Sequence, residues 1–225
     1  MNVEAAIFDL DGTLIDSVPA YLKILEIILE KVHLPPVPRE TVSTLMRGGV
    51  EGWKLLIPEE MKDQEDELRP KILAVAHEAS RKIFPKEVRL FSGVPEIFYE
   101  LSSKKIKIGL VTSSHARTIE AKLLPLKDQG IDALIDEVIS IDDVRKIKPA
   151  PEPLIECAWR MNVNRRKSVY IGDSYVDLRA GRSAGMMTVG VLTGMDDYET
   201  LKNEEPDLIV AHIGDLRNTF NQVLE

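Results

Sequence analysis

The sequence predicts an α/β protein: a Rossmann-like parallel sheet with helices on both faces, and an all-helical cap inserted after the first strand. Three observations lead to this prediction. From residue 86 onward, short apolar runs alternate with helical patterns, as in a parallel sheet wrapped by helices. Residues 3–8 form another apolar run. The stretch between them shows helical periodicity and no convincing strand. We therefore expect a core domain of residues 1–15 and 86–225 and a cap domain of residues 16–85.

The core strands are predicted from runs that are apolar at nearly every position, as in parallel strands covered on both faces. They are expected at residues 3–8, 106–112, 134–140, 168–172, 187–192 and 208–210. Apolar residues at helical spacing predict core helices at residues 94–103, 116–126, 152–161, 176–183 and 215–224.

The cap is predicted to contain three helices, at residues 17–32, 40–56 and 59–83. Arg47, followed by Gly48 and Gly49, interrupts the second of them. This arginine is expected to reach into the site and bind a charged group of the substrate; the alternative is a solvated side chain. His77 and Arg81 lie four residues apart on the third helix and are expected on its solvated face.

Composition and charge exclude several classes of protein. A net charge of −8 leaves no basic surface for nucleic acid. The single cysteine, Cys157, rules out a disulfide within the chain. There is no basic stretch followed by an apolar run at the start, and no run of about 18 apolar residues. We therefore expect a cytoplasmic protein with no membrane partner; the sequence does not indicate its oligomeric state.

Polar residues follow four of the predicted strands at the point where each strand ends. The carboxyl ends of parallel strands meet at one edge of a sheet, where ligands bind. Carboxylate oxygens suit Mg²⁺, and a lysine with hydroxyl and amide groups suits a phosphoryl group. The residues in question are Asp9 and Asp11, Thr112 and Ser113, Lys148, and Asp173 and Asp177.

These motifs resemble those of the haloacid dehalogenase (HAD) superfamily, in its phosphatase branch with a helical cap, which includes phosphoglycolate phosphatases and β-phosphoglucomutases. Four segments resemble the four family motifs in their order along the chain: "DLDGT", "LVTSS", "KPAPEP" and "GDSYVD". The segment between the first and second motifs resembles the helical cap of the family.

The resemblance implies catalytic roles for three residues. Asp9 would be the nucleophile that becomes phosphorylated, and Asp11 would be the general acid and base. Lys148 would neutralise charge on the phosphoryl oxygens and on Asp9. This division of roles agrees with the chemistry, because a carboxylate that attacks a phosphate needs positive charge nearby.

The resemblance also implies binding roles. Thr112 and the amide of Ser113 would bind the transferring phosphoryl group. Mg²⁺ would be held by Asp9, by the backbone carbonyl of Asp11 and by Asp173, with Asp177 supporting the metal or its waters.

The sequence therefore predicts a Mg²⁺-dependent phosphatase that hydrolyses small phosphate monoesters through an aspartyl-phosphate intermediate. The expected partner is a small phosphorylated metabolite that a cap can enclose, such as phosphoglycolate or a sugar phosphate. Two alternatives remain open. One is a phosphomutase of the β-phosphoglucomutase type. The other is a phospho-acceptor regulatory module, although such modules need no cap and have no second aspartate two residues after the acceptor.

Overall fold

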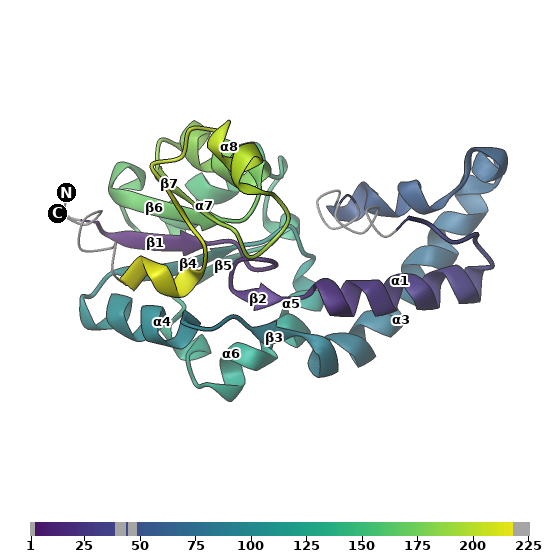
Figure 1. Cartoon of the computed structure of the whole chain (residues 1–225), viewed down its shortest axis with the longest axis horizontal. Coiled ribbons are helices and arrows are strands. Elements are labelled where there is room, and N and C mark those ends of the chain that lie inside the picture. The colour runs from purple at the N-terminus through teal and green to yellow at the C-terminus, as the bar shows by residue number, and fades with distance from the viewer. Residues whose placement is uncertain (1–2, 39–43, 45–48, 218–225) are drawn as a thin grey trace.

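A six-stranded sheet forms the centre of the protein (Figure 1). The structure is a computed structural model that describes residues 3–38, 44 and 49–217. The strand order is β5-β4-β1-β6-β7-β8 and all pairings are parallel. The strands are β1 (Ala5–Phe8), β4 (Lys107–Val111), β5 (Glu137–Ile139), β6 (Ser168–Gly172), β7 (Met187–Val191) and β8 (Leu208–Val210). The predicted Rossmann-like fold is confirmed.

Helices cover both faces of the sheet (Figure 1). The helices α7 (Glu152–Arg160) and α8 (Tyr175–Ala184) pack on one face, and α4 (Val94–Ser103) packs on the other. Strand β1 is buried on both sides: Ala5 and Ile7 join the apolar cluster under α7 and α8, whereas Phe8 joins the cluster that contains α4. Burial on both faces explains why the strand is an unbroken apolar run.

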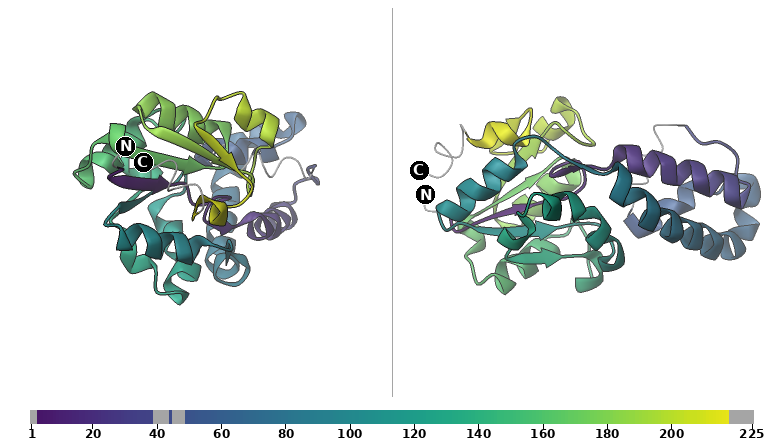
Figure 2. Two further views of the ribbon diagram at one scale, coloured as in Figure 1. Left: turned by 60° about the vertical axis from the view of Figure 1, so that its left-hand side comes forward. Right: turned by 90° about the horizontal axis from the view of Figure 1, so that it is seen from below.

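A helical segment extends from one end of the sheet (Figures 1 and 2). Its long helices α1 (Val18–Val32) and α3 (Glu65–Glu87) pack against each other, and the 3-10 helices η1 (Gly49–Leu56) and η2 (Glu59–Gln64) precede α3. A two-stranded antiparallel ribbon, β2 (Ile15–Asp16) and β3 (Arg89–Leu90), connects this segment to the sheet. We propose this ribbon as the junction between the core domain (1–15 and 86–225) and the cap domain (16–85).

The remaining elements connect the strands. They are the helices α5 (Ala116–Lys122), α6 (Leu124–Asp128) and α9 (Tyr198–Lys202), and the 3-10 turns η3 (Asp132–Leu134), η4 (Ile141–Asp143), η5 (Arg165–Lys167) and η6 (Ile213–Asp215). No helix in the part of the chain that the structure describes has the length and hydropathy needed to cross a membrane.

The structure corrects several predicted element boundaries. The single helix expected at residues 116–126 is divided at Leu123, because Pro125 has no N–H with which to continue it. The strand expected at residues 134–140 is limited to β5, and its first residue, Leu134, belongs to η3. The third cap helix begins as the 3-10 helix η2. Its α-helical part, α3, continues through Pro85 to Glu87, since a proline in the last turn does not end the helix there.

Two other predicted helices lie partly outside the described residues. Of the second cap helix, residues 49–56 are 3-10 rather than α-helix, and most of the rest is not described. Of the helix expected at residues 215–224, the structure describes only the start, which follows η6.

Candidate active site

A cavity of about 240 Å³ lies where the carboxyl ends of β1 and β6 face α1 and α3. The strand order switches between β1 and β6, and such switch points are where open α/β sheets bind ligands. We call the side formed by the strand ends the floor; it carries Asp9, Lys148, Asp173 and Asp177. We call the opposite side the apolar wall; it consists of Ile24, Leu25 and Ile28 on α1 and Ile72, Leu73 and Phe84 on α3.

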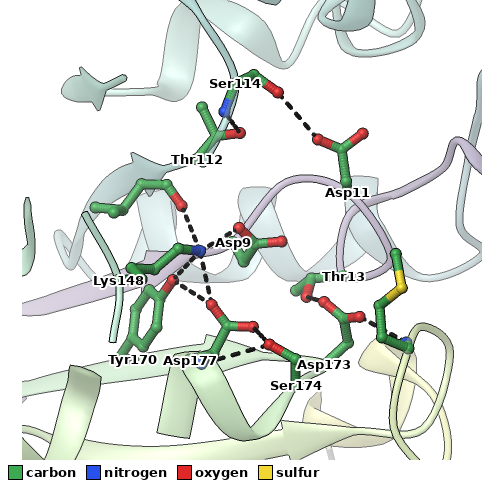
Figure 3. Close-up of polar contacts among 12 residues, drawn as sticks. Asp9, Asp11, Thr13, Thr112, Ser114, Lys148, Tyr170, Asp173, Ser174 and Asp177 are labelled. Carbon is green, nitrogen blue, oxygen red and sulfur yellow. Dashed lines mark hydrogen bonds and ion pairs between the residues drawn. The ribbon is translucent and has the colours of Figure 1, made fainter. Parts of the chain in front are cut away.

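Lys148 joins two carboxylates of the floor (Figure 3). Its Nζ lies 2.6 Å from Oδ1 of Asp9 and 2.6 Å from Oδ1 of Asp177, and it also donates to the hydroxyl of Tyr170 at 3.0 Å. All these side chains are buried. Asp9 follows β1, whereas Lys148 comes from the loop before α7, so the fold brings together residues 139 positions apart.

The floor contains a cluster of three acidic side chains. Carboxylate oxygens of Asp9, Asp173 and Asp177 lie within 4.8 Å of one another. The hydroxyl of Thr13 donates to Oδ1 of Asp173 at 3.0 Å, and the backbone N–H of Met195 donates to Oδ2 at 2.8 Å. These hydrogen bonds hold Asp173 in place beside Asp9, and they do so from two different loops.

The charges of the floor are not balanced. Three carboxylates face one ammonium, which leaves two negative charges in a buried place. Burial, with the neighbouring charges of Asp177 and Asp11, raises the pKa of Asp9 to about 7 despite the attraction of Lys148. Burial also raises the pKa of Asp173, and the charges of Asp177 and Asp9 add to this effect. A divalent cation with a preference for oxygen ligands, such as Mg²⁺, therefore fits this donor set.

Two glycines leave room for the carboxylate of Asp173. A Cβ atom on Gly194 would lie 1.9 Å from its Oδ2, and one on Gly12 would lie 2.5 Å from the same atom. Gly12 also has a φ of +86°, in the region that favours glycine. The glycine of "DLDGT" thus serves both the turn after the aspartate pair and the packing of the acidic cluster.

Asp11 has a different partner from Asp9. The ammonium of Lys122, on α5, lies 2.8 Å from its Oδ1 and 2.6 Å from its Oδ2. Lys122 also donates to the hydroxyls of Tyr21 (2.8 Å) and Ser114 (2.7 Å), and its side chain is 1% exposed. Burial alone would lower the pKa of Lys122, but Asp11 and Tyr21 raise it above its usual value, so the ammonium keeps its charge. The Asp11 side chain is thus not part of the acidic cluster of the floor.

The predicted phosphoryl-binding residues lie at the end of β4. Ser113 lines the cavity. Thr112 is buried, and its Oγ1 accepts a hydrogen bond from the N–H of Ser114 at 3.2 Å instead of lining the cavity (Figure 3). Arg47, the residue expected to reach in from the cap, lies outside the described residues.

Two residues at or beside the cavity were not foreseen from the sequence. Lys122 was overlooked, although it occupies the apolar stripe of its segment: Ile119, Lys122 and Leu126 are all buried and follow one another at helical spacing. His77 was expected on a solvated face, but it is half-buried and lines the cavity. A lysine within an apolar stripe is a signal that the sequence offered; nothing in the sequence distinguished His77 from the solvated residues of its helix.

Comparison with known proteins agrees with this geometry. The sequence profile described as "Haloacid dehalogenase-like hydrolase" matches residues 6–191. A phosphoglycolate phosphatase of Yersinia pestis is 28% identical over 95% of this chain and 91% of its own length. The pyrophosphatase PpaX of Bacillus velezensis is 31% identical over 96% of this chain and 95% of its own length. The crystal structure of a predicted phosphoglycolate phosphatase from Haemophilus somnus shares the fold, with a TM-score of 0.86 at 22% identity over 98% of this chain and 99% of that one.

Proposed function

The chain belongs to the haloacid dehalogenase-like hydrolase family, and from this premise we propose that it is a Mg²⁺-dependent phosphatase of small phosphate monoesters. We further propose that the reaction passes through an aspartyl-phosphate on Asp9. The observation that supports this most is the buried floor: Asp9 lies against Lys148 in an acidic cluster that lacks two positive charges. A divalent cation would supply the missing positive charge, and a phosphate monoester would supply a reactant for Asp9.

In the first step, a carboxylate oxygen of Asp9 attacks phosphorus and the bond from phosphorus to the ester oxygen breaks. An acyl phosphate forms on Asp9, and the organic group leaves as an alcohol after it receives a proton from Asp11. The ammonium of Lys148 stabilises the negative charge that develops on the phosphoryl oxygens. When bound by Asp9 and Asp173, with Asp177 close by, Mg²⁺ would neutralise further phosphoryl charge.

In the second step, water attacks the phosphorus of the acyl phosphate and inorganic phosphate leaves Asp9. Asp11 accepts the proton of this water. In the structure the ammonium of Lys122 contacts both carboxylate oxygens of Asp11. Proton donation in the first step therefore requires Asp11 to turn from Lys122 toward the substrate. Ser113, two residues after β4, would bind a phosphoryl oxygen through its amide.

The decisive experiment measures phosphate release from acetyl phosphate and p-nitrophenyl phosphate, with Mg²⁺ and with a chelator. We expect Mg²⁺-dependent turnover that Asp9→Asn reduces at least about 10³-fold, because an amide of the same shape cannot act as the nucleophile. Asp63→Asn is the matched control, since Asp63 is exposed on η2 and does not line the cavity.

Three outcomes would contradict the proposal. If Asp9→Asn retains full activity, Asp9 is not the nucleophile. If the protein accumulates a stable acyl phosphate on Asp9 without turnover, it is a phospho-acceptor module. If a sugar phosphate is isomerised and no phosphate is released, the protein is a phosphomutase.

A further inference from the structure

The organic part of the substrate must occupy the space beside the apolar wall. The floor and the apolar wall line one continuous cavity, and in-line attack by Asp9 would direct the ester oxygen of a bound phosphate away from the floor. The side chains on α1 and α3 therefore indicate the chemistry of the organic part of the substrate. This reading rests on the proposed phosphatase function.

The helices offer very few polar groups to a ligand. Among the described residues, no lysine, arginine, aspartate or glutamate of α1 or α3 lines the cavity. Tyr21 is already bonded to Lys122, and the hydroxyl of Ser80 donates to the carbonyl of Ala76 at 2.7 Å within its own helix. A carboxylate or a row of sugar hydroxyls packed against the six side chains of the apolar wall would lose its hydration without gaining partners there.

One polar group on this side of the cavity is unpaired. His77, one turn from Leu73 along α3, lines the cavity, and its Nδ1 is buried without a hydrogen-bond partner. This nitrogen gains a partner when the ring turns it toward a ligand that brings a donor or acceptor. The described residues of α1 and α3 thus give the cavity an apolar side with a single unpaired polar point, whereas His115, Arg117 and Thr118 line it at the start of α5.

We propose that the substrate is a phosphate monoester with an apolar organic body, an alkyl or aryl group that packs against the apolar wall and carries at most one polar group, directed to His77. The size of the cavity supports this. At about 240 Å³ it exceeds the ~150 Å³ that an enclosed apolar cavity needs to bind benzene, which leaves room for the phosphoryl group. Highly polar esters such as phosphoglycolate and the sugar phosphates are expected to be poor substrates.

The test compares straight-chain alkyl phosphates from methyl to hexyl with phosphoglycolate and glucose 6-phosphate. We expect kcat/KM to increase about two- to fourfold for each added methylene, because each is buried against apolar side chains. A kcat/KM for phosphoglycolate or glucose 6-phosphate above that for hexyl phosphate would overturn the proposal, and so would a series that is flat in chain length.

A pair of variants tests whether the dependence of kcat/KM on chain length arises at the apolar wall. Leu73 and Leu22 are both half-buried, but only Leu73 lines the cavity. Leu73→Asn is expected to lower the ratio of hexyl to methyl phosphate kcat/KM about tenfold, whereas Leu22→Asn leaves the ratio unchanged. Methyl phosphate serves as the internal standard for folding, because it has the least apolar surface of the series to bury against the wall. Equal ratios in the two variants would contradict the proposed location.

Binding without turnover separates this proposal from the proposed function. Hexylphosphonate and methylphosphonate, which cannot be hydrolysed in this way, are titrated into the wild-type protein with Mg²⁺ in a calorimeter. Tighter binding of hexylphosphonate supports the apolar substrate, even if no ester releases phosphate, in which case only the phosphatase function fails. Equal affinity for the two phosphonates, with turnover of acetyl phosphate, overturns the apolar substrate and leaves the phosphatase function standing.

Discussion

The floor and the apolar wall of the cavity are built on opposite principles. On the floor, every charged side chain is held by named partners: Lys148 by two carboxylates, Asp173 by Thr13 and an N–H of Met195. The apolar wall has no charged group among the described residues, and its polar point, His77, lacks a partner at one nitrogen. In the proposed reaction the floor carries out the chemistry, and the wall would select the substrate.

Lys122 lies on the border between the two. It joins Asp11, which belongs to the loop after β1, to Tyr21 on α1, and its ammonium lies 5.0 Å from the centre of the Phe84 ring on α3. The two buried lysines therefore differ in what they connect. Lys148 stays within the core, whereas Lys122 ties a core carboxylate to the helices of the apolar wall. The predictions below test this difference, starting from the largest expected effect.

Replacement of Lys148 should affect activity most. Lys148→Met removes the ammonium 2.6 Å from Asp9 and should reduce phosphate release about 10²–10³-fold, the range found when one preorganised charge-stabilising group is lost. Lys146→Met, the same change at an exposed position of the same loop, should retain activity. Steady-state kinetics on folded protein checks this. An effect of similar size in Lys146→Met would show that the loop, and not the ammonium, matters.

Replacement of Lys122 should affect stability as well as activity. Lys122→Met leaves the carboxylate of Asp11 without its ion-pair partner and should lower the free energy of unfolding by about 1–3 kcal/mol, less than for a fully buried pair because the Asp11 side chain is 17% exposed. The double variant Asp11→Asn with Lys122→Met should recover part of this loss.

Urea denaturation of the single and double variants measures the coupling. Lys127→Met is the control, since its ion pair with Glu120 is exposed and long, at 3.6 Å. Strictly additive losses for Asp11→Asn and Lys122→Met would mean that the two side chains are not coupled.

The metal-free protein should become less stable as the pH rises. The pKa of Asp9 is raised to about 7 in the folded chain, whereas an unfolded aspartate titrates near 3.9. Between about pH 4 and 7 the folded chain therefore holds a proton that the unfolded chain has lost, so stability decreases through this window. Asp173, whose pKa is also raised, acts in the same direction.

Mg²⁺ should compete with these protons and so reduce the loss of stability as the pH rises. We expect Tm in chelator to fall by a few °C from pH 5 to pH 7.5, and to fall less with saturating Mg²⁺. Differential scanning calorimetry checks both curves. If Tm in chelator is constant or increases over this range, the carboxylates of the floor do not hold protons when folded, and a curve that Mg²⁺ leaves unchanged would count against metal binding here.

Much of the core could be predicted from the sequence because its signals are local. Strands β6 and β8 have the predicted bounds, since both are short, mostly apolar runs that begin directly after a charged residue. Asp9 and Asp173 directly follow β1 and β6, so knowledge of these strand ends was enough to bring the two carboxylates together. The ribbon of β2 and β3 was not predicted, because two residues in each strand leave no periodic pattern.

The sequence by itself determined the parallel sheet, the helical insertion and the residues that gather at the strand ends, because strand periodicity and turn residues are properties of neighbouring positions. Only the tertiary structure decided that Lys122 pairs with Asp11, that Asp11 is separate from the acidic cluster, and that α1 and α3 present an apolar surface to the floor. These features depend on contacts between elements far apart in the chain, and on which side of a helix the rest of the protein leaves open.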